Sequence, residues 1–569
     1  MTDSAADRPL IVQGDHSVLL EADHPRAAEA RDRLLAFAEL VKSPEHVHTY
    51  RVTPLSVWHA RAAGLAGEAI VAALAELSRF PVPANVAAEI RDWSSRYGRL
   101  RLLRGEGGNL RLEADEPDLL AGLYRRPGVG PLLRDRDGTH AARADAAERG
   151  RLKLALVQAG YPVEDLAGYS AGEPLPIALR SETRAGLPFA VRDYQRRAAQ
   201  AFWAGGTEAG GAGIVVLPCG AGKTIVGLAA MVLHQTSTLI LTTGTTASRQ
   251  WLAELLDKTT LEEHQVGEYS GTVKDVRPVT VASYQILTRR PRKDAPFAHL
   301  ELFARRDWGL IVYDEVHVLP APVFQITAGL QARRRLGLTA TLVREDGRED
   351  DVFALIGPKR ADVPWKEMER EGWIAAAVCT EVRVPLPAAE RRDYALAEKR
   401  DQFRLASENP AKVALVARLL ELHRGEPALV IGMYVEQMER LAEALGLPLL
   451  KGSTVQRRRD ALYADFRAGR VPVLAVTKIA NYALDLPDAA VAIQVSGTFG
   501  SRQEEAQRLG RILRPKAGAN QAHFYTLVSA DTVEQDFALR RQLFLCEQGY
   551  EYAIRDAGEL EPAPAGSAG

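Results

Sequence analysis

The sequence predicts a mixed α+β N-terminal region followed by two tandem α/β domains, each of which is built on a parallel sheet. The chain has 569 residues, which is too long for a single core. After residue 190, short apolar runs recur with helix-length stretches between them: GIVVLP, TLILTT, LIVYD, RLGLTAT, ALVIGM, PVLAVT, AVAIQV and HFYTLV. Such runs are typical of buried parallel strands. A break near residues 361–378 predicts two sheets in series.

The N-terminal region lacks this repeat of short apolar runs. RAAEARDRLLAFAELV and GEAIVAALAEL have helical periodicity, whereas GRLRLLRGEGGNLRLEA alternates like a hairpin. EPLPIALRSETRAGLPF is rich in Pro, Arg and Gly and is typical of a linker. We therefore expect the following segments: a mixed domain (1–110), a smaller domain (111–175), a linker (176–190), a first α/β domain (191–362), a connector with a charged insert (363–415), a second α/β domain (416–548) and a disordered tail (549–569).

Composition and charge set limits on the class of protein. The formal net charge is −1, so any phosphate-binding surface has to be a local one. The three cysteines are far apart and have no metal-ligand spacing, which favours a reducing compartment. The first residues are polar, unlike a signal peptide, and no apolar run reaches membrane-spanning length. We therefore expect a cytoplasmic protein without a membrane segment.

A glycine-rich turn between a predicted strand and a predicted helix indicates a nucleotide site. Gly220, Ala221 and Gly222 form a turn whose backbone N–H groups can approach phosphate closely. Lys223 can neutralise the β- and γ-phosphates of ATP, and the Thr224 hydroxyl can ligate Mg²⁺. The strict pattern has a further Gly where this chain has Leu217.

The run LIVYDEVH predicts the second half of that site. Asp314 ends an apolar strand, where it can hold Mg²⁺ through water, and Glu315 is suited to polarise the attacking water. His317 is a candidate to couple this site to the other domain. Upstream, the amide of Gln195, in the string Arg192-Asp-Tyr-Gln, could select adenine; a surface glutamine is the alternative.

A second cluster, QRLGRILR, lies near the other end of the chain. Arg511 and Arg514 share one face if the segment is helical. Guanidinium groups match phosphate oxygens in a bidentate manner, so these arginines are candidates to act on ATP during hydrolysis. The alternative is a solvated, arginine-rich helix.

Taken together, these strings resemble the superfamily-two helicases. RDYQ, PCGAGKT, TTGTTASRQW, ASYQIL, DEVH, TAT, TKIANYALDLPDA and QRLGRILR stand in the order of that superfamily's motifs, over residues 190 to about 515. DEVH followed by TATLVRED resembles the XPB branch, and PEHVHTYRVTPLSVWHARAAG extends the resemblance into the N-terminal half. One departure is Ala483, where many relatives have Gly.

The resemblance implies two recA-like domains and an ATP-dependent 3′→5′ DNA helicase or double-strand translocase linked to nucleotide excision repair. ATP and Mg²⁺ are the implied cofactors, and DNA and a nuclease are the implied partners. Residues 111–175 lie where relatives carry a proposed damage-recognition domain, and residues 386–408 where they carry a thumb-like element. The resemblance also implies nucleotide contacts by Arg192, Asp485 and Gln507, and duplex splitting by the first Arg-Glu-Asp tripeptide, which comprises Arg344, Glu345 and Asp346.

Contacts to nucleic acid in such motors are mostly to phosphate. The candidates lie after predicted strands, and the densest basic cluster is residues 289–293. Three other interpretations stay open: an ATP-gated nucleic-acid-binding scaffold, an RNA helicase, and the motor of a restriction or defence system. The candidate contacts are Thr243, Gln250, Trp251, Ser283, Tyr284, Thr477 and Lys478.

Overall fold

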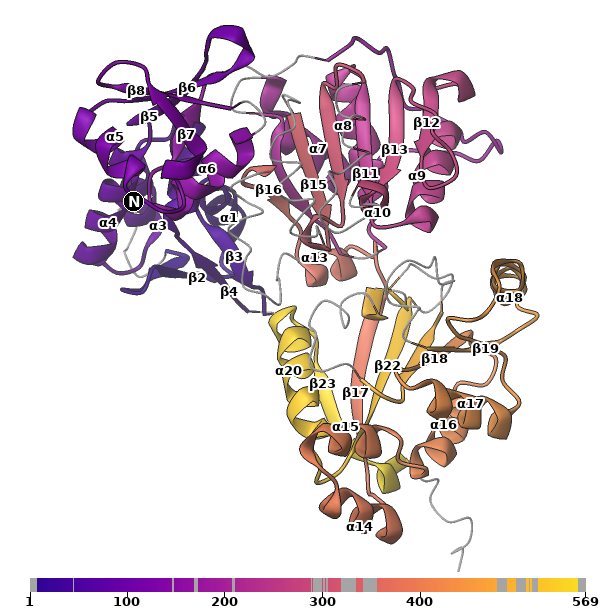
Figure 1. The fold of residues 1–569 in the computed structure, drawn as a ribbon. Helices are drawn as coiled ribbons and strands as arrows, with labels where there is room; N and C mark the ends of the chain where they lie inside the picture. The colour runs from indigo at the N-terminus through magenta and orange to yellow at the C-terminus, as the bar shows by residue number, and fades with distance from the viewer. Residues whose placement is uncertain are drawn as a thin grey trace, which may run out of the picture. The chain divides into compact units, whose positions relative to one another are not determined.

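The computed structural model separates the chain into two compact units (Figure 1). Unit 1 comprises residues 1–217 and 222–363, and unit 2 comprises residues 364–569 with the short segment 218–221. The division at residue 363 lies within the stretch 361–378, where the sequence predicts a break between two sheets. No helix in the described part is long and apolar enough to cross a membrane. The structure describes residues 8–44, 46–145, 148–167, 172–206, 210–218, 220–287, 289, 299, 302, 305–318, 334–340, 356–477, 489–497, 508–510, 512, 513 and 520–560.

Unit 1 begins with a four-stranded antiparallel sheet in the order β1-β2-β4-β3. Thr53 begins helix α2 with a capping box, in which its hydroxyl accepts from the Ser56 N–H and the Ser56 hydroxyl accepts from the Thr53 N–H. The elements are β1 (Leu10–Val12), β2 (Ser17–Glu21), α1 (Ala27–Leu35), β3 (Glu39–Lys42), β4 (Val47–Arg51), α2 (Pro54–Ala62), α3 (Gly67–Leu77) and α4 (Ala84–Arg96).

A five-stranded sheet follows, in the order β7-β8-β6-β5-β9. The predicted hairpin is confirmed, since β5 and β6 pair antiparallel. The predicted boundary at residue 110 is wrong, because β6 also pairs with β8 and the hairpin therefore belongs to this second sheet. The elements are β5 (Leu100–Arg104), β6 (Leu110–Ala114), α5 (Pro117–Tyr124), β7 (Leu133–Arg136), β8 (Ala141–Ala144), α6 (Arg149–Gln158) and β9 (Val163–Asp165).

The third sheet of unit 1 is parallel, in the order β12-β13-β11-β14-β15-β10-β16. Its central strands are buried on both faces, which is why they are continuously apolar in the sequence. The elements are α7 (Asp193–Trp203), β10 (Ala212–Val216), α8 (Lys223–His234), β11 (Thr238–Thr242), α9 (Thr245–Lys258), β12 (Val266–Tyr269), β13 (Val279–Ser283), α10 (Tyr284–Leu287), β14 (Leu310–Asp314), β15 (Arg334–Thr339) and β16 (Lys359–Asp362).

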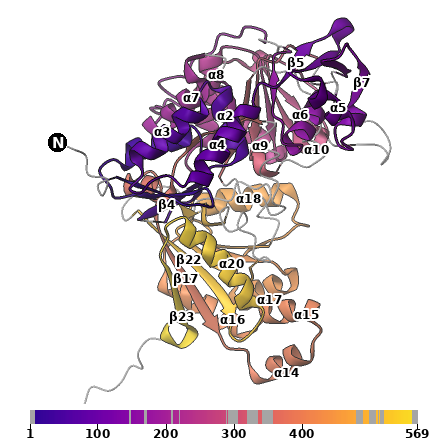
Figure 2. The ribbon, with the colours of Figure 1, turned by 90° about the vertical axis from the view of Figure 1, so that its left-hand side faces the viewer.

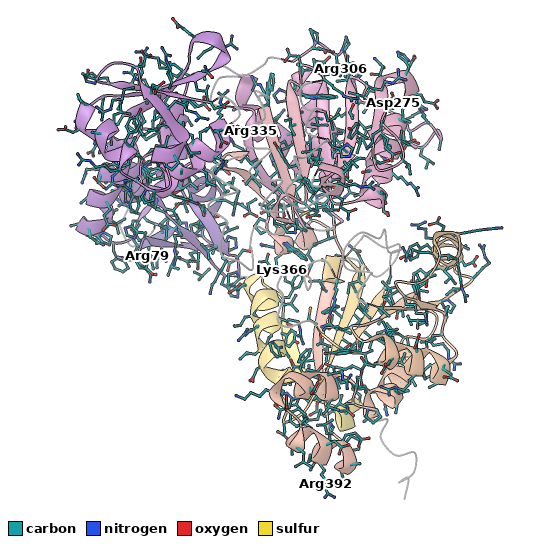
Figure 3. The ribbon with its side chains drawn as sticks, in the orientation of Figure 1. Arg79, Asp275, Arg306, Arg335, Lys366 and Arg392 are labelled. Atoms are coloured by element: carbon teal, nitrogen blue, oxygen red, sulfur yellow. The ribbon has the colours of Figure 1, made fainter. Side chains whose placement is uncertain are left out.

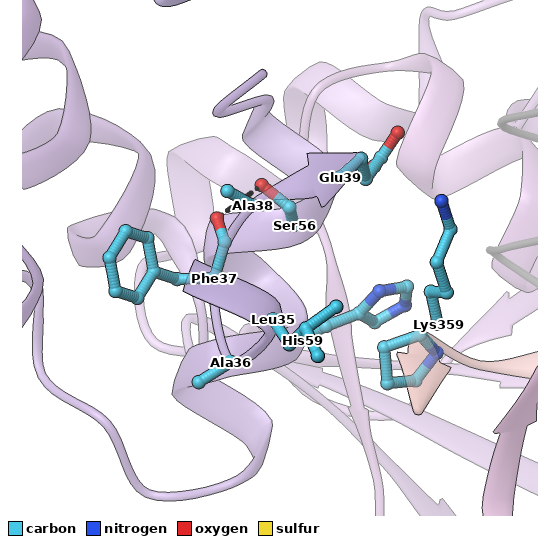
Figure 4. Close-up of a pocket in the computed structure, with 9 residues that line it drawn as sticks. Leu35, Ala36, Phe37, Ala38, Glu39, Ser56, His59 and Lys359 are labelled. Carbon is cyan, nitrogen blue, oxygen red and sulfur yellow. Dashed lines mark hydrogen bonds between the residues drawn. The ribbon is translucent and has the colours of Figure 1, made fainter. Parts of the chain in front are cut away.

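The N-terminal region and the parallel sheet of unit 1 share a core. Leu55 and Trp58 of α2 belong to the same buried cluster as strand residues such as Ile214 and Ile311. Lys359 of β16 donates to the Leu40 carbonyl at 3.1 Å and pairs with Asp362 at 2.8 Å. Figure 4 shows the small recess beside this contact, lined in part by Glu39, Ser56, His59 and Lys359.

Unit 2 is a second parallel sheet, in the order β19-β20-β18-β21-β22-β17-β23. Helix α20 lies alongside β22 and β23 (Figure 2). The elements are α13 (Trp365–Arg370), β17 (Ala376–Val384), α14 (Ala388–Leu396), α15 (Lys399–Ser407), α16 (Ala411–Leu422), β18 (Ala428–Gly432), α17 (Val435–Leu445), β19 (Leu449–Leu450), α18 (Gln456–Arg467), β20 (Val473–Thr477), β21 (Val491–Gln494), β22 (Gln521–Ser529), α20 (Glu534–Glu547) and β23 (Tyr552–Asp556).

Two parallel α/β sheets after a mixed N-terminal region confirm the predicted fold class, but two predicted boundaries are wrong. β17 lies inside the predicted connector, yet it is an integral strand that pairs with β22 and β23. β23 lies inside the predicted disordered tail, yet it pairs with β17. The charged insert forms the helical hairpin α14–α15.

Candidate active site

The glycine turn leads from β10 into helix α8. Gly220 and Gly222 have φ angles of 82° and 77°, a left-handed conformation that side chains rarely adopt. A Cβ on Gly222 would also meet Gln195 Nε2 at 2.5 Å. Lys223 is the first residue of α8 and Thr224 is the second. This geometry fits the predicted phosphate loop, because it places the start of a twelve-residue helix directly after the turn.

Lys223 pairs with the acidic residues at the end of β14. Its Nζ lies 2.8 Å from Glu315 Oε1, and the two side chains are 12% and 20% exposed. Glu315 has a φ of 49°, unusual for a residue with a side chain. Its Oε2 accepts no hydrogen bond from the part of the chain that the structure describes. The cluster therefore joins a cation to an ionisable acid, and one oxygen of that acid has no hydrogen bond within the described residues.

The two adjacent carboxyl groups titrate in opposite directions. Burial, with the negative charge of Glu315 beside it, raises the pKa of Asp314 to about 6. Burial also tends to raise the pKa of Glu315, but the Lys223 ammonium and His317 outweigh it and lower that pKa below its usual value. Glu315 therefore stays ionised to lower pH than Asp314 does, and a group that polarises water must be ionised at neutral pH.

Three neighbouring side chains fix this cluster. The Trp251 indole N–H donates to Asp314 Oδ2 at 3.0 Å, and the Tyr284 hydroxyl donates to the Asp314 carbonyl at 2.9 Å. His317 Nδ1 lies 3.4 Å from Glu315 Oε2 and contacts the Thr339 hydroxyl at the end of β15. His317 thus connects the acidic motif to the Thr-Ala-Thr motif, which begins at the last residue of β15.

Gln195 and Arg192 lie at the start of α7. The side-chain oxygen Oε1 of Gln195 accepts a hydrogen bond from the Arg192 backbone N–H at 3.0 Å, and Gln195 Nε2 lies 3.3 Å from the Tyr194 hydroxyl. Gln195 is buried against Gly222, which places it beside the phosphate loop rather than on the surface. The alternative of a surface glutamine is therefore wrong.

The residues of this site fit a Mg²⁺–nucleotide. A buried carboxylate, a hydroxyl on the first turn of a helix and a glycine cradle are the groups such a ligand needs. Because Mg²⁺ keeps several water and phosphate ligands, few protein ligands suffice. Within the described ranges no group of three or more His, Cys, Asp or Glu forms a metal site by itself.

Several of the residues that the sequence predicts as DNA contacts are buried in the structure. Trp251 is 1% exposed and its indole is committed to Asp314, so its side chain cannot contact DNA. The prediction fails because Trp251 lies on the inner face of α9, where it packs on Gly227 of α8. Tyr284, Ser283 and Thr477 are also buried, with 2%, 4% and 1% exposure. Thr243 is half-buried after β11, and Gln250 is exposed on α9.

The remaining predicted residues lie outside the described part of the chain. They are Arg344, Glu345, Asp346, Lys478, Asp485, Gln507, Arg511 and Arg514. Their predicted roles therefore stay predictions. Sequence reasoning missed the supporting roles of Trp251, Tyr284 and Thr339, although all three stand in the motif strings TTGTTASRQW, ASYQIL and TAT.

Three family models match the chain: one described as ERCC3/RAD25/XPB C-terminal helicase over residues 368–561, one as Type III restriction enzyme, res subunit, over 188–344, and one as Helicase conserved C-terminal domain over 10–137.

Similar proteins with curated names extend over nearly the whole chain. A protein named DNA 3′-5′ helicase XPB from Mycobacterium tuberculosis is 52% identical over 97% of this chain and 99% of its own. Its namesake from Kineococcus radiotolerans is 53% identical over 98% of both chains. The XPB/SSL2 helicase/translocase subunit of general transcription and DNA repair factor IIH from Saccharomyces cerevisiae is 30% identical over 96% of this chain and 72% of its own. The chain belongs to the XPB family of helicases.

Proposed function

We propose that this protein is an ATP-driven DNA motor, a 3′→5′ helicase or double-strand translocase that acts in DNA repair. The observation that carries the proposal is the cluster of Lys223, Asp314 and Glu315 behind the glycine turn. Family membership supports it, since the bacterial relatives are named 3′-5′ DNA helicases and the yeast relative is a subunit of a DNA repair factor.

Each residue of the cluster has a distinct role in the proposed reaction. Backbone N–H groups of the turn and the Lys223 ammonium bind the ATP phosphates. The ionised Glu315 polarises the attacking water, and His317 keeps Glu315 oriented. Asp314 and Thr224 would hold Mg²⁺, which when bound neutralises charge on the phosphate oxygens.

The proposal assigns the remaining nucleotide contacts by motif. Gln195 and Arg192 select the base, while Asp485 and Gln507 contact the nucleotide. Arg511 and Arg514 stabilise the charge that develops during hydrolysis, so turnover requires both units. Thr243, Gln250 and Lys478 contact DNA. Arg344, Glu345 and Asp346 split the duplex. A nuclease partner follows from the resemblance alone.

The test is ATP turnover with single-stranded DNA, duplex, forked DNA and RNA at matched nucleotide concentrations. We expect DNA, and forked or duplex DNA most, to stimulate turnover well above RNA. Equal stimulation by RNA would favour the RNA helicase interpretation. Stimulated turnover without strand displacement or translocation would favour the ATP-gated scaffold.

DNA affinity supplies a second test. Because the proposed contacts are mainly to phosphate, duplex affinity should fall by orders of magnitude between about 50 mM and 200 mM salt. An affinity that hardly changes over this range would contradict a binding mode in which the protein contacts mainly the DNA phosphates.

A further inference from the structure

The hydroxyl of Tyr284 reaches across the parallel sheet of unit 1 to the acidic motif. Tyr284 is the first residue of α10, directly after β13, and it is 2% exposed. In the sheet, β11 lies between β13 and β14, which places β13 about 10 Å from β14, so the side chain has to pass the carboxyl end of β11. Its hydroxyl donates to the Asp314 carbonyl at 2.9 Å. Because Tyr284 is buried, this bond replaces the predicted contact with DNA.

The carbonyl that Tyr284 binds belongs to the peptide that precedes a strained residue. Glu315 has a φ of 49°, a left-handed conformation that is unfavourable for a residue with a Cβ. The angle φ is the rotation about the bond between the Glu315 nitrogen and its Cα, and the Asp314 carbonyl lies in the same rigid plane as that nitrogen. Rotation of this plane would relieve the strain, but it would break the hydrogen bond to Tyr284. The hydroxyl therefore opposes the relaxation.

The residues on both sides of Glu315 are also held in place. Before it, the Trp251 indole N–H donates to the Asp314 side chain at 3.0 Å. After it, Val316 is fully buried and belongs to the same core cluster as Tyr284. A residue stays in an unusual backbone conformation only where its surroundings determine that conformation. The strain at Glu315 is therefore maintained by its neighbours, and Tyr284 is the neighbour that binds the peptide itself.

The same backbone conformation sets where the Glu315 carboxylate lies. Its Oε1 is 2.8 Å from Nζ of Lys223, the first residue of α8. Rotation of the preceding peptide would move the nitrogen to which the Glu315 Cα is bonded, and so would tilt the Cα–Cβ bond. A group that activates water has to stay within about 0.5 Å and roughly 10–20° of its productive geometry. A modest tilt would therefore slow hydrolysis without removing the carboxylate from the site.

We propose that Tyr284 is a positioning residue for ATP hydrolysis. Its hydroxyl holds the peptide between Asp314 and Glu315, keeps Glu315 in the left-handed conformation, and so directs the Glu315 carboxylate to the phosphate site. Tyr284 acts through Glu315 rather than on the nucleotide. The inference rests on the proposed function, because it requires Glu315 to polarise the attacking water.

The first test is ATP hydrolysis by the full-length protein with Tyr284→Phe, which keeps the ring and removes the hydroxyl. We expect kcat to fall by about tenfold, because the Glu315 carboxylate is less well placed for the attacking water. The KM for ATP should stay within about twofold of wild type, since Lys223 and the glycine turn are unchanged.

The matched control is Tyr269→Phe. Tyr269 is also 2% exposed and belongs to the same core cluster, but its hydroxyl contacts His299 Nδ1 at 3.0 Å instead of the acidic motif. It ends β12 at the edge of the sheet, beside the turn that carries Asp275 (Figure 3). This variant loses a buried hydroxyl of the same kind, and its turnover should equal that of wild type.

A second measurement separates positioning from packing. In a Glu315→Gln background the side chain no longer polarises water as a carboxylate does. Tyr284→Phe should therefore change the remaining single-turnover rate by less than about twofold in that background. A hydroxyl that only supported packing would lower the rate by the same factor in both backgrounds.

The strain at Glu315 is tested by thermal unfolding. Glu315→Gly and Glu315→Ala both lack the carboxylate, but only glycine adopts a φ of 49° without strain. The glycine variant should therefore unfold at a temperature about 2 °C higher than the alanine variant. Adding Tyr284→Phe to both should narrow this difference, because the peptide before residue 315 can then rotate.

Three results would overturn the inference: wild-type kcat in Tyr284→Phe, an equal loss in the two backgrounds, and a Glu315→Ala variant as stable as Glu315→Gly. The comparison of glycine with alanine needs no tyrosine variant, so it decides the inference if Tyr284→Phe does not fold. Normal turnover in Glu315→Gln, or a wild-type protein that does not hydrolyse ATP, would instead contradict the proposed function.

Discussion

Two lysine–glutamate pairs of equal length lie at the carboxyl ends of the two parallel sheets, and they differ in what surrounds them. Lys223–Glu315 and Lys412–Glu534 both have a closest contact of 2.8 Å. The first is 12% and 20% exposed and has an oxygen without a hydrogen bond; the second is 0% exposed and uses both oxygens. An incompletely satisfied pair that solvent can reach can exchange partners with a ligand, whereas a fully satisfied one can only hold its neighbours in place.

The largest expected difference between the pairs is in catalysis. Lys223→Met should lower kcat/KM for ATP by about a thousandfold, because it removes a preorganised cation from the phosphate site. Steady-state turnover at saturating DNA measures the effect. Turnover within tenfold of wild type would show that Lys223 belongs to a structural pair like the one in unit 2.

The loss in the free energy of unfolding should instead be larger for the pair in unit 2. Lys412→Met leaves Glu534 buried and unpaired and should lower the free energy of unfolding by about 3–5 kcal/mol. Lys223→Met leaves Glu315 at a site that solvent can reach, where the carboxylate can take up a proton, and should therefore cost less than Lys412→Met. Urea unfolding of the two variants measures both values, and equal losses would contradict the comparison.

Some of this comparison was predictable from the sequence, because the nucleotide motifs are local. The glycine turn, Lys223, Asp314 and Glu315 stand within short strings whose order fixes their place at strand ends. The Lys412–Glu534 pair joins residues 122 positions apart, and neither belongs to a motif. The same limit explains β23, which pairs with β17 from far along the chain. It also explains Trp251, since the motif string does not say which face of α9 is buried.

The indole of Trp251 gives a smaller, more specific effect. Trp251→Phe keeps an aromatic ring of α9 packed against α8 but removes the indole N–H that lowers the pKa of Asp314. Turnover should fall by about tenfold, since a hydrogen bond to a charged group contributes roughly 1.5–3 kcal/mol. Trp58→Phe is the matched control, because the Trp58 indole donates to the Trp93 backbone carbonyl and not to a residue of the candidate site. Equal losses in both variants would indicate packing rather than the hydrogen bond.

The smallest expected effect is a shift with pH. Because the pKa of Asp314 is raised to about 6, kcat/KM for ATP should fall as the pH drops through about 6, where this carboxyl becomes protonated and loses its hold on Mg²⁺. In Trp251→Phe the acid limb should move to higher pH, since the lost donor favoured the ionised form. An acid limb near the ordinary aspartate pKa in both proteins would contradict the assignment.

The most direct test of the account is Glu315→Gln, with ATP binding and DNA-stimulated turnover measured on the same preparation. Glutamine keeps the shape of the side chain but cannot polarise water as a carboxylate does. The account predicts ATP affinity within a few-fold of wild type and turnover lower by about 10²–10⁴. Normal turnover in this variant would remove Glu315 from catalysis and contradict the central claim that the cluster behind the glycine turn hydrolyses ATP.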